Sequence, residues 1–276
     1  MIRRAALISA LALGLAVPAL PQAQPAPPAP AVEPDLKLSL TYDGKILIKV
    51  LDLSLKQDIR PTSYDTAVRL KSYGILSAFK KLDQRASASG TVSGANLKPG
   101  LFTQQNFDGR KNRKVVARWT GSDVIAVATP DFPNWGDPPA TKAQKVVGAD
   151  PLTQIARIAM APTAQGPCNG DTRFFDGKYL YKIDFTSPQA VKLPERARKL
   201  NLTNGVHCQV TFQEMAGFKA KPADKRNQGL DRPISVDFAQ VGAGGPWVIF
   251  QIRAGTPLGD AVIDLTSVEM NGTRPA

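Results

Sequence analysis

Two cysteines and one histidine carry the most specific chemistry in this sequence. Cys168 and Cys208 are the only thiols, and the only histidine, His207, directly precedes the second of them. Neighbouring residues on a strand point to opposite faces, and no acidic cluster completes a ligand set, so a metal site is disfavoured. In an oxidising compartment an even pair of cysteines is most simply a disulfide. We therefore expect a Cys168–Cys208 bridge, with two free buried thiols as the alternative.

Recognisable catalytic motifs are missing from the sequence. The run from Gly90 to Gly94 has the wrong spacing for a nucleophile elbow, and neither an H-E-x-x-H motif, a phosphate-binding loop nor a dinucleotide fingerprint occurs. We expect no catalytic residue, no cofactor and no metal, and hence no enzyme. One alternative stays open, because scattered carboxylates could converge in space: a carboxylate-dependent hydrolase acting on cell-wall glycan.

The first residues have the composition of an export signal. Arg3 and Arg4 precede an uncharged, Ala- and Leu-rich stretch from Ala5 to Val17, too short for the roughly 20 residues that span a bilayer. We predict a signal peptide over residues 1–23, cleaved near residues 19–24, a Pro/Ala-rich linker over 24–34, and a single β-rich periplasmic domain over 35–276. No later apolar run reaches spanning length, so the protein is not expected to be transmembrane.

The chain is strongly basic, with 35 Lys and Arg against 23 Asp and Glu and a net charge of +12. In an exported protein this charge points to an anionic envelope component and not to nucleic acid. The alternative is a solvated basic surface that serves solubility. The basic residues form three clusters, which are Arg110, Lys111, Arg113 and Lys114; Lys192, Arg196, Arg198 and Lys199; and Lys219, Lys221, Lys225 and Arg226.

Period-2 alternation of apolar residues recurs along the chain and predicts ten to twelve sequential strands. Turns are expected at Asp43-Gly44, Gly121-Ser122 and Asp176-Gly177. Helical spacing occurs twice, from Ile75 to Leu82 and from Asp150-Pro151 to a point before Pro162. The predicted fold is mainly β: a large curved antiparallel sheet (half-barrel or β-spiral, like that of lipoprotein carriers) with two short helices.

A long sheet with one apolar face needs that face covered, and two short helices are scant cover. We therefore expect a non-catalytic periplasmic protein that supports the cell envelope and binds a lipid, another amphipathic ligand or an envelope partner on the concave face of the sheet. A third alternative is a scaffold that docks anionic envelope components. Six aromatic residues are candidates to line the ligand site, although ordinary core packing is the more common role for each: Tyr64, Phe79, Phe102, Trp119, Phe185 and Trp247.

The stretch from residue 150 to 218 resembles a known family. Asp150-Pro151-Leu152-Thr153 is followed by Gly166-Pro167-Cys168-Asn169-Gly170, then by Phe174-Phe175-Asp176-Gly177-Lys178 with Tyr181, and later by Cys208 with Gly217-Phe218. This pattern is similar to that of a family of uncharacterised proteobacterial exported proteins, domain of unknown function 3108. The resemblance implies a periplasmic β-rich protein with a curved sheet, and it supplies no catalytic residues.

Overall fold

The computed structural model describes residues 35–79, 81–109, 112–162, 166–168, 171–219, 234–256 and 259–274. The expected signal peptide and linker therefore lie outside the described residues. The described part of the chain forms thirteen strands and four short helices. The strands are β1 (Leu36–Ile46), β2 (Ile48–Ile59), β3 (Ser63–Ser72), β4 (Asp83–Ser93), β5 (Asn96–Asn106), β6 (Lys114–Trp119), β7 (Val124–Thr129), β8 (Asp171–Phe175), β9 (Leu180–Val191), β10 (Leu202–Ala216), β11 (Ile234–Val241), β12 (Trp247–Thr256) and β13 (Gly259–Met270). The helices are α1 (Gly74–Phe79), α2 (Lys142–Val146), α3 (Pro151–Ala159) and α4 (Glu195–Arg198).

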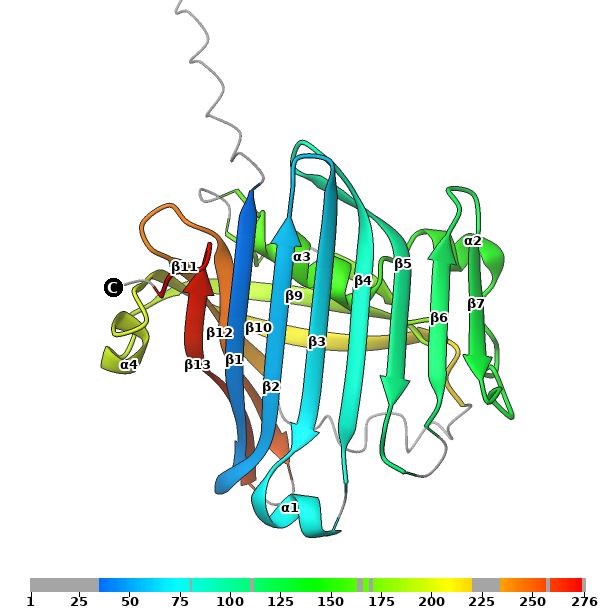
Figure 1. The fold of residues 1–276 in the computed structure, drawn as a ribbon, viewed down its shortest axis with the longest axis horizontal. Helices are drawn as coiled ribbons and strands as arrows, with labels where there is room; N and C mark the ends of the chain where they lie inside the picture. The colour runs from blue at the N-terminus through cyan, green and yellow to red at the C-terminus, as the bar shows by residue number, and fades with distance from the viewer. Residues whose placement is uncertain are drawn as a thin grey trace, which may run out of the picture. The chain divides into compact units, whose positions relative to one another are not determined.

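All thirteen strands belong to one antiparallel sheet, in the order β7-β6-β5-β4-β3-β2-β1-β13-β12-β11-β10-β9-β8. Two meanders, β1 to β7 and β8 to β13, are joined where β1 pairs with β13. The sheet is curved and unclosed, and β9 and β10 run across behind β1 to β5 (Figure 1). The prediction of a large curved antiparallel sheet is confirmed.

The segment that connects the two edge strands, β7 and β8, contacts both edges of the sheet. Ala149 forms a parallel bridge with Phe174 of β8, and the Trp119 indole of β6 donates to the Gly148 carbonyl oxygen at 3.1 Å. Gly177, in the β8–β9 turn, sits against Val115 of β6. The two edges are therefore linked through the backbone of residues 148–149 and not through a strand-to-strand ladder.

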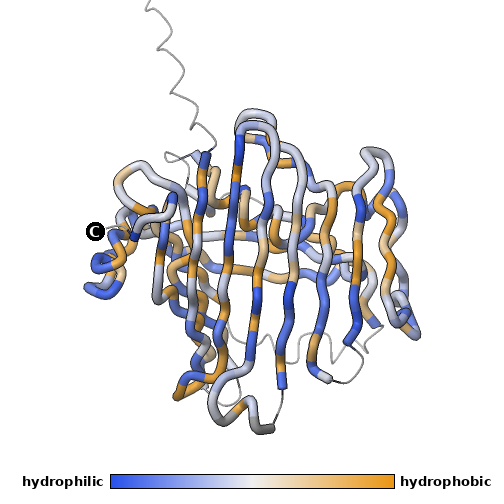
Figure 2. The backbone as a smooth tube through the Cα atoms, viewed as in Figure 1, coloured by the Kyte–Doolittle hydropathy of each residue, from blue (hydrophilic) through white to orange (hydrophobic). Residues whose placement is uncertain are grey.

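The interior of the curved sheet is filled by side chains and by α3. Burial alternates along β1, where Leu36, Leu38, Leu40 and Tyr42 point inward, and the same alternation is visible as changing hydropathy along the strands (Figure 2). Helix α3 packs against β3, β4, β5, β8 and β12, and it lies behind β2 to β4 in Figure 1. No helix in the described ranges combines the length and the apolar composition needed to cross a membrane.

Several local predictions are confirmed. Asp150 is the N-cap of α3 and Pro151 its first residue, and α1 covers the start of the predicted 75–82 helix. The turns at residues 121–122 and 176–177 connect β6 to β7 and β8 to β9. Residues 131–140 form no helix or strand, as expected for an irregular loop.

Other local predictions are wrong. Asp43-Gly44 is not a turn but lies within β1, paired with Asp52 and Leu51, and the chain turns at Leu47. A Cβ on Gly44 would stand 2.8 Å from the Leu51 Cβ, so the glycine permits a close approach of two strands. Strand β5 and helices α2 and α4 were not predicted, so the described chain has four helical segments where two were expected.

Candidate functional site

The structure joins Cys168 and Cys208 in a disulfide, with the Cα atoms 6.1 Å apart. The bridge ties the short stretch 166–168, which follows α3, to the middle of β10. It is buried beside Val236, Phe238 and Trp247 in a second apolar cluster. His207 pairs instead with Asp237, its Nδ1 standing 2.6 Å from the carboxylate oxygen. Among the described residues, no group of three or more His, Cys, Asp or Glu side chains is arranged to hold a metal ion.

The six aromatic candidates do not gather into one site. Tyr64, Phe102 and Trp247 are buried in the core. Trp119 packs edge-on against Phe175, with 6.4 Å between ring centroids. The Phe79 side chain lies outside the described part of the molecule. Phe185 alone among the six lines a described pocket, and at the same time it packs against Phe238.

A buried polar chain fixes α3 inside the sheet. The Asp150 carboxylate accepts hydrogen bonds from the backbone N–H of Leu152 at 3.0 Å and of Thr153 at 2.8 Å. The Thr153 hydroxyl donates to the same carboxylate, and the Tyr64 hydroxyl on β3 bonds to the Thr153 hydroxyl. Burial raises the pKa of Asp150, against the opposing effect of these hydrogen bonds. The helix is thus both capped and attached to the sheet by one carboxylate.

Arg157 is the one charged residue of α3, and it points into the interior. Its guanidinium donates from Nε and Nη2 to the Leu97 carbonyl oxygen, at 3.0 and 2.6 Å, and from Nη1 to Gln154 Oε1 at 3.0 Å. These acceptors are all neutral, and among the described side chains no carboxylate forms an ion pair with it. Burial lowers the pKa of Arg157, and the negative charge of Asp150 opposes this effect.

The guanidinium lines a hollow of about 340 Å³ between the end of α3, the start of β5 and strands β8 and β9. We call this hollow the Arg157 pocket. Its walls are mostly apolar, and its volume lies at the small end of the roughly 300–1,000 Å³ that is typical of ligand sites. The apolar lining comes from Leu97, Ile158, Met160, Pro167, Phe174 and Phe185. The sequence signal that could have identified Arg157 is a single charge within an otherwise uncharged helix.

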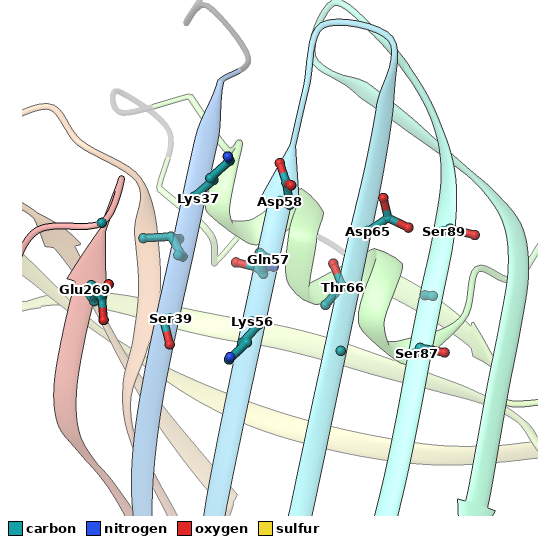
Figure 3. A pocket seen from close by; sticks show the side chains of 14 residues that line it. Lys37, Ser39, Lys56, Gln57, Asp58, Asp65, Thr66, Ser87, Ser89 and Glu269 are labelled. Carbon is teal, nitrogen blue, oxygen red and sulfur yellow. The ribbon is translucent and has the colours of Figure 1, made fainter.

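A second hollow, of about 590 Å³, lies on the outer face of the sheet across β13, β1, β2, β3 and β4. The strand register arranges its lining in two rows, visible in Figure 3: Lys37, Asp58, Asp65 and Ser89 in one, and Ser39, Lys56, Ala67 and Ser87 in the next. The floor consists of small residues, and the lining charges are of both signs. This outer groove is a shallow surface lined by small residues and by charges of both signs.

The outer groove contains a pair of facing carboxylates, the kind of pair that a glycan hydrolase would need. Asp58 and Asp65 are cross-strand partners, and both accept from the Arg60 guanidinium, at 2.7 and 3.2 Å. Paired-carboxylate catalysis relies on two different environments that separate an acid from a base. Here a single cation serves both groups, and this arrangement does not favour the hydrolase alternative.

The basic clusters are only partly described. Arg196 of α4 pairs with Asp264 at 2.8 Å and stacks over the Phe250 ring, and Lys199 pairs with Glu195 at 2.9 Å. Arg113 donates to the Pro130 and Asp131 carbonyl oxygens. These residues of the first two clusters are thus engaged within the protein. Arg110, Lys111, Lys221, Lys225 and Arg226 lie outside the described residues.

Comparison with known proteins gives a likeness in fold and no family. No protein-family model matches the sequence, so membership in the 3108 family is not shown, and no curated protein matches it. The chain is similar in structure to a β-barrel-like protein of domain of unknown function DUF1849 from Brucella abortus. The two share 10% sequence identity with a TM-score of 0.49, over 87% of this chain and 100% of the other.

Proposed function

We propose that this chain is a non-catalytic, exported protein of the bacterial cell envelope that binds a small amphipathic anion in the Arg157 pocket. The export signal over residues 1–23 and the pairing of the only two thiols support the periplasmic location. On this proposal the chain is one of the uncharacterised exported β-rich proteins whose sequence pattern is similar to that of residues 150–218.

The observation that carries the proposal is the charge balance around Arg157. A guanidinium withdrawn from water is normally held by a carboxylate or a phosphate, because hydrogen bonds to neutral oxygens only partly replace its hydration. Here its described acceptors are a backbone carbonyl and an amide, while the rest of the pocket lining is mostly apolar. An anionic head group beside Arg157 with a short apolar chain along Phe174 and Phe185 satisfies both parts of this lining.

The ionic and apolar parts of this ligand can be tested separately with octanoate and octan-1-ol, which share a chain length but differ in charge. Binding of each to the purified protein is measured by isothermal titration calorimetry at low ionic strength. We expect octanoate to bind at least tenfold more tightly than octan-1-ol. Equal affinities, or no binding of either probe, would contradict the proposal.

Variants assign the binding to the pocket. Arg157→Met keeps an unbranched apolar chain but removes the charge, and it should abolish the preference for octanoate, whereas Arg157→Lys should retain part of it. Arg173→Met is the matched control, because Arg173 is an exposed arginine on the adjacent strand β8. Thermal unfolding of each variant shows whether the fold is intact. If folded Arg157→Met keeps the octanoate preference, the anion binds elsewhere.

A further inference from the structure

An apolar tip protrudes at one end of the sheet, far along the chain from the Arg157 pocket. It consists of Leu47, in the turn between β1 and β2, of Ile48, the first residue of β2, and of Tyr73, which follows β3; their exposed fractions are 92%, 57% and 48%. Tyr73 lies beside strand β2, which begins at Ile48, because its N–H donates to the Val50 carbonyl oxygen at 2.7 Å. The Lys49 ammonium lies 4.5 Å from the centre of the Tyr73 ring.

The backbone at Leu47 makes this exposure unusual. Its φ is +66°, in the left-handed region that a residue with a Cβ occupies only at an energetic cost. The other non-glycine residues with a positive φ in the described ranges are four asparagines and a serine: Asn112, Asn201, Asn204, Asn271 and Ser187. Short polar side chains are the ordinary choice there, since they bond to the local backbone. Leu47 therefore combines an unfavourable conformation with an unfavourable exposure.

Charged groups surround the tip. Lys45 and Lys49 face each other across the β1–β2 pair. Lys49 is held by Asp43 at 2.8 Å and Asp52 at 2.6 Å, and these carboxylates raise its pKa; Lys45 pairs with Asp264 at 3.4 Å. Exposed Lys71 and Lys81 lie at the same end of the sheet, at the end of β3 and after α1. The tip is thus an apolar centre with an aromatic ring and a collar of lysines.

The size of the tip decides between a protein partner and a lipid surface. A stable protein–protein interface buries about 800 Å² on each partner, from 20 or more residues, and three side chains cannot supply that area. A bilayer requires much less, because a few apolar side chains can enter the acyl boundary while aromatic rings and lysines remain at head-group level. The net charge of +12 adds long-range attraction to anionic lipid.

We propose that the protein docks on an anionic lipid bilayer through this tip, with Leu47 and Ile48 inserted at the lipid–water interface and Tyr73 and Lys49 at the head groups. This site is separate from the Arg157 pocket and does not depend on the proposed ligand. The protein would hold its sheet upright on the membrane, with β1, β2 and β3 ending at the surface.

The test is flotation of the full chain with vesicles of phosphatidylglycerol and phosphatidylcholine in equal parts, and with phosphatidylcholine alone. The informative variant is Leu47→Asn combined with Ile48→Ser. The control is Ile125→Ser with Val127→Ser on the edge strand β7, where both side chains are 54% exposed, so exposed apolar surface is removed at a site away from the tip. Each protein carries the same residues 1–34, so any contribution of that segment cancels in the comparison.

We expect wild-type protein to float with the anionic vesicles, the tip variant to bind them at least tenfold more weakly, and the control to bind as wild type does. The Leu47→Asn change should leave the melting temperature unchanged or raise it, because asparagine suits the left-handed backbone. Equal binding by the tip variant, equal loss in the control, or no binding of wild type to anionic vesicles would each overturn the proposal. None of these outcomes bears on octanoate binding, which is measured without lipid.

Discussion

Replacing Asp150 tests whether one carboxylate really holds α3 inside the sheet. Asp150→Ala removes the acceptor for the backbone N–H groups of Leu152 and Thr153 and for the Thr153 hydroxyl. Loss of an N-cap costs about 1 kcal/mol, and a buried hydroxyl left without its acceptor costs about 1–3 kcal/mol more. We expect a loss of about 2–4 kcal/mol in the free energy of unfolding, or roughly 5–15 °C in melting temperature for a domain of this size.

The matched control is Thr141→Ala, which removes the side-chain cap of α2. That helix is capped in the same way, by a bond from the Gln144 N–H to the Thr141 hydroxyl at 3.3 Å, but its residues are not buried. Its loss should cost less than about 1 kcal/mol. Urea denaturation followed by circular dichroism measures both variants. If the two substitutions cost the same, the buried chain from Asp150 through Thr153 to Tyr64 contributes nothing beyond an ordinary cap, and the reasoning is refuted.

Asp150→Asn separates the charge from the hydrogen bonds. Burial raises the pKa of Asp150 in the folded protein, so the folded state binds more protons than the unfolded state between the two pKa values. Stability from this group is therefore fully present below the unfolded pKa and declines as the pH rises through that window. The stability of Asp150→Asn relative to wild type should improve from about pH 4 towards neutral pH. A relative stability that falls over the same range would contradict the sign of the shift.

Two further predictions concern crosslinking and acid stability. Reduction of the Cys168–Cys208 disulfide, which spans a sequence separation of 40 residues, should lower the free energy of unfolding by about 4 kcal/mol on the chain-entropy model. If reductant produces two free thiols but leaves the denaturation midpoint unchanged, the disulfide does not stabilise the fold. The Arg69 guanidinium lowers the pKa of Asp83 below its usual 3.8, so the stabilising charge is present above that value and is lost as the pH falls through the folded pKa. Asp83→Asn should be less stable than wild type at neutral pH, and the difference should shrink on acidification; a constant difference would show that the ion pair is not responsible.

Period-2 alternation predicted most of the sheet because the burial of each strand follows it closely, but it could not show how the glycines are used. Gly177 provides a positive φ in a turn, as predicted. Gly44 instead makes room for Leu51 in the middle of a strand pair. An Asp-Gly dipeptide has the same sequence in both places, and only the neighbouring strand distinguishes them.

Strand β5 shows a second limit of reading local pattern. Pro99 and Gly100 interrupt its alternation, so no strand was predicted there, yet the strand is continuous through a register shift opposite Ser89 and Gly90. A bulge absorbs one residue and tolerates proline, so the ladder resumes beyond it. The candidate site was not predicted for a related reason. The apolar stripe of α3 is visible in the sequence, but the surroundings of its single cation, Arg157, come from strands that are distant in sequence.

The pairing of β1 with β13 has a consequence for how the protein is made. The Lys37 N–H and the Asn271 side chain that bond to each other are 234 residues apart, so one side of the first folded strand stays open until the last strand has been synthesised. Pairings this distant in sequence slow folding and leave a strand edge free to associate with other chains in the meantime. Loss of the final strand, β13, would divide the sheet in its interior instead of shortening it at one edge. The open edge of β1 in the newly made chain therefore needs to be kept from pairing with other chains until β13 is in place.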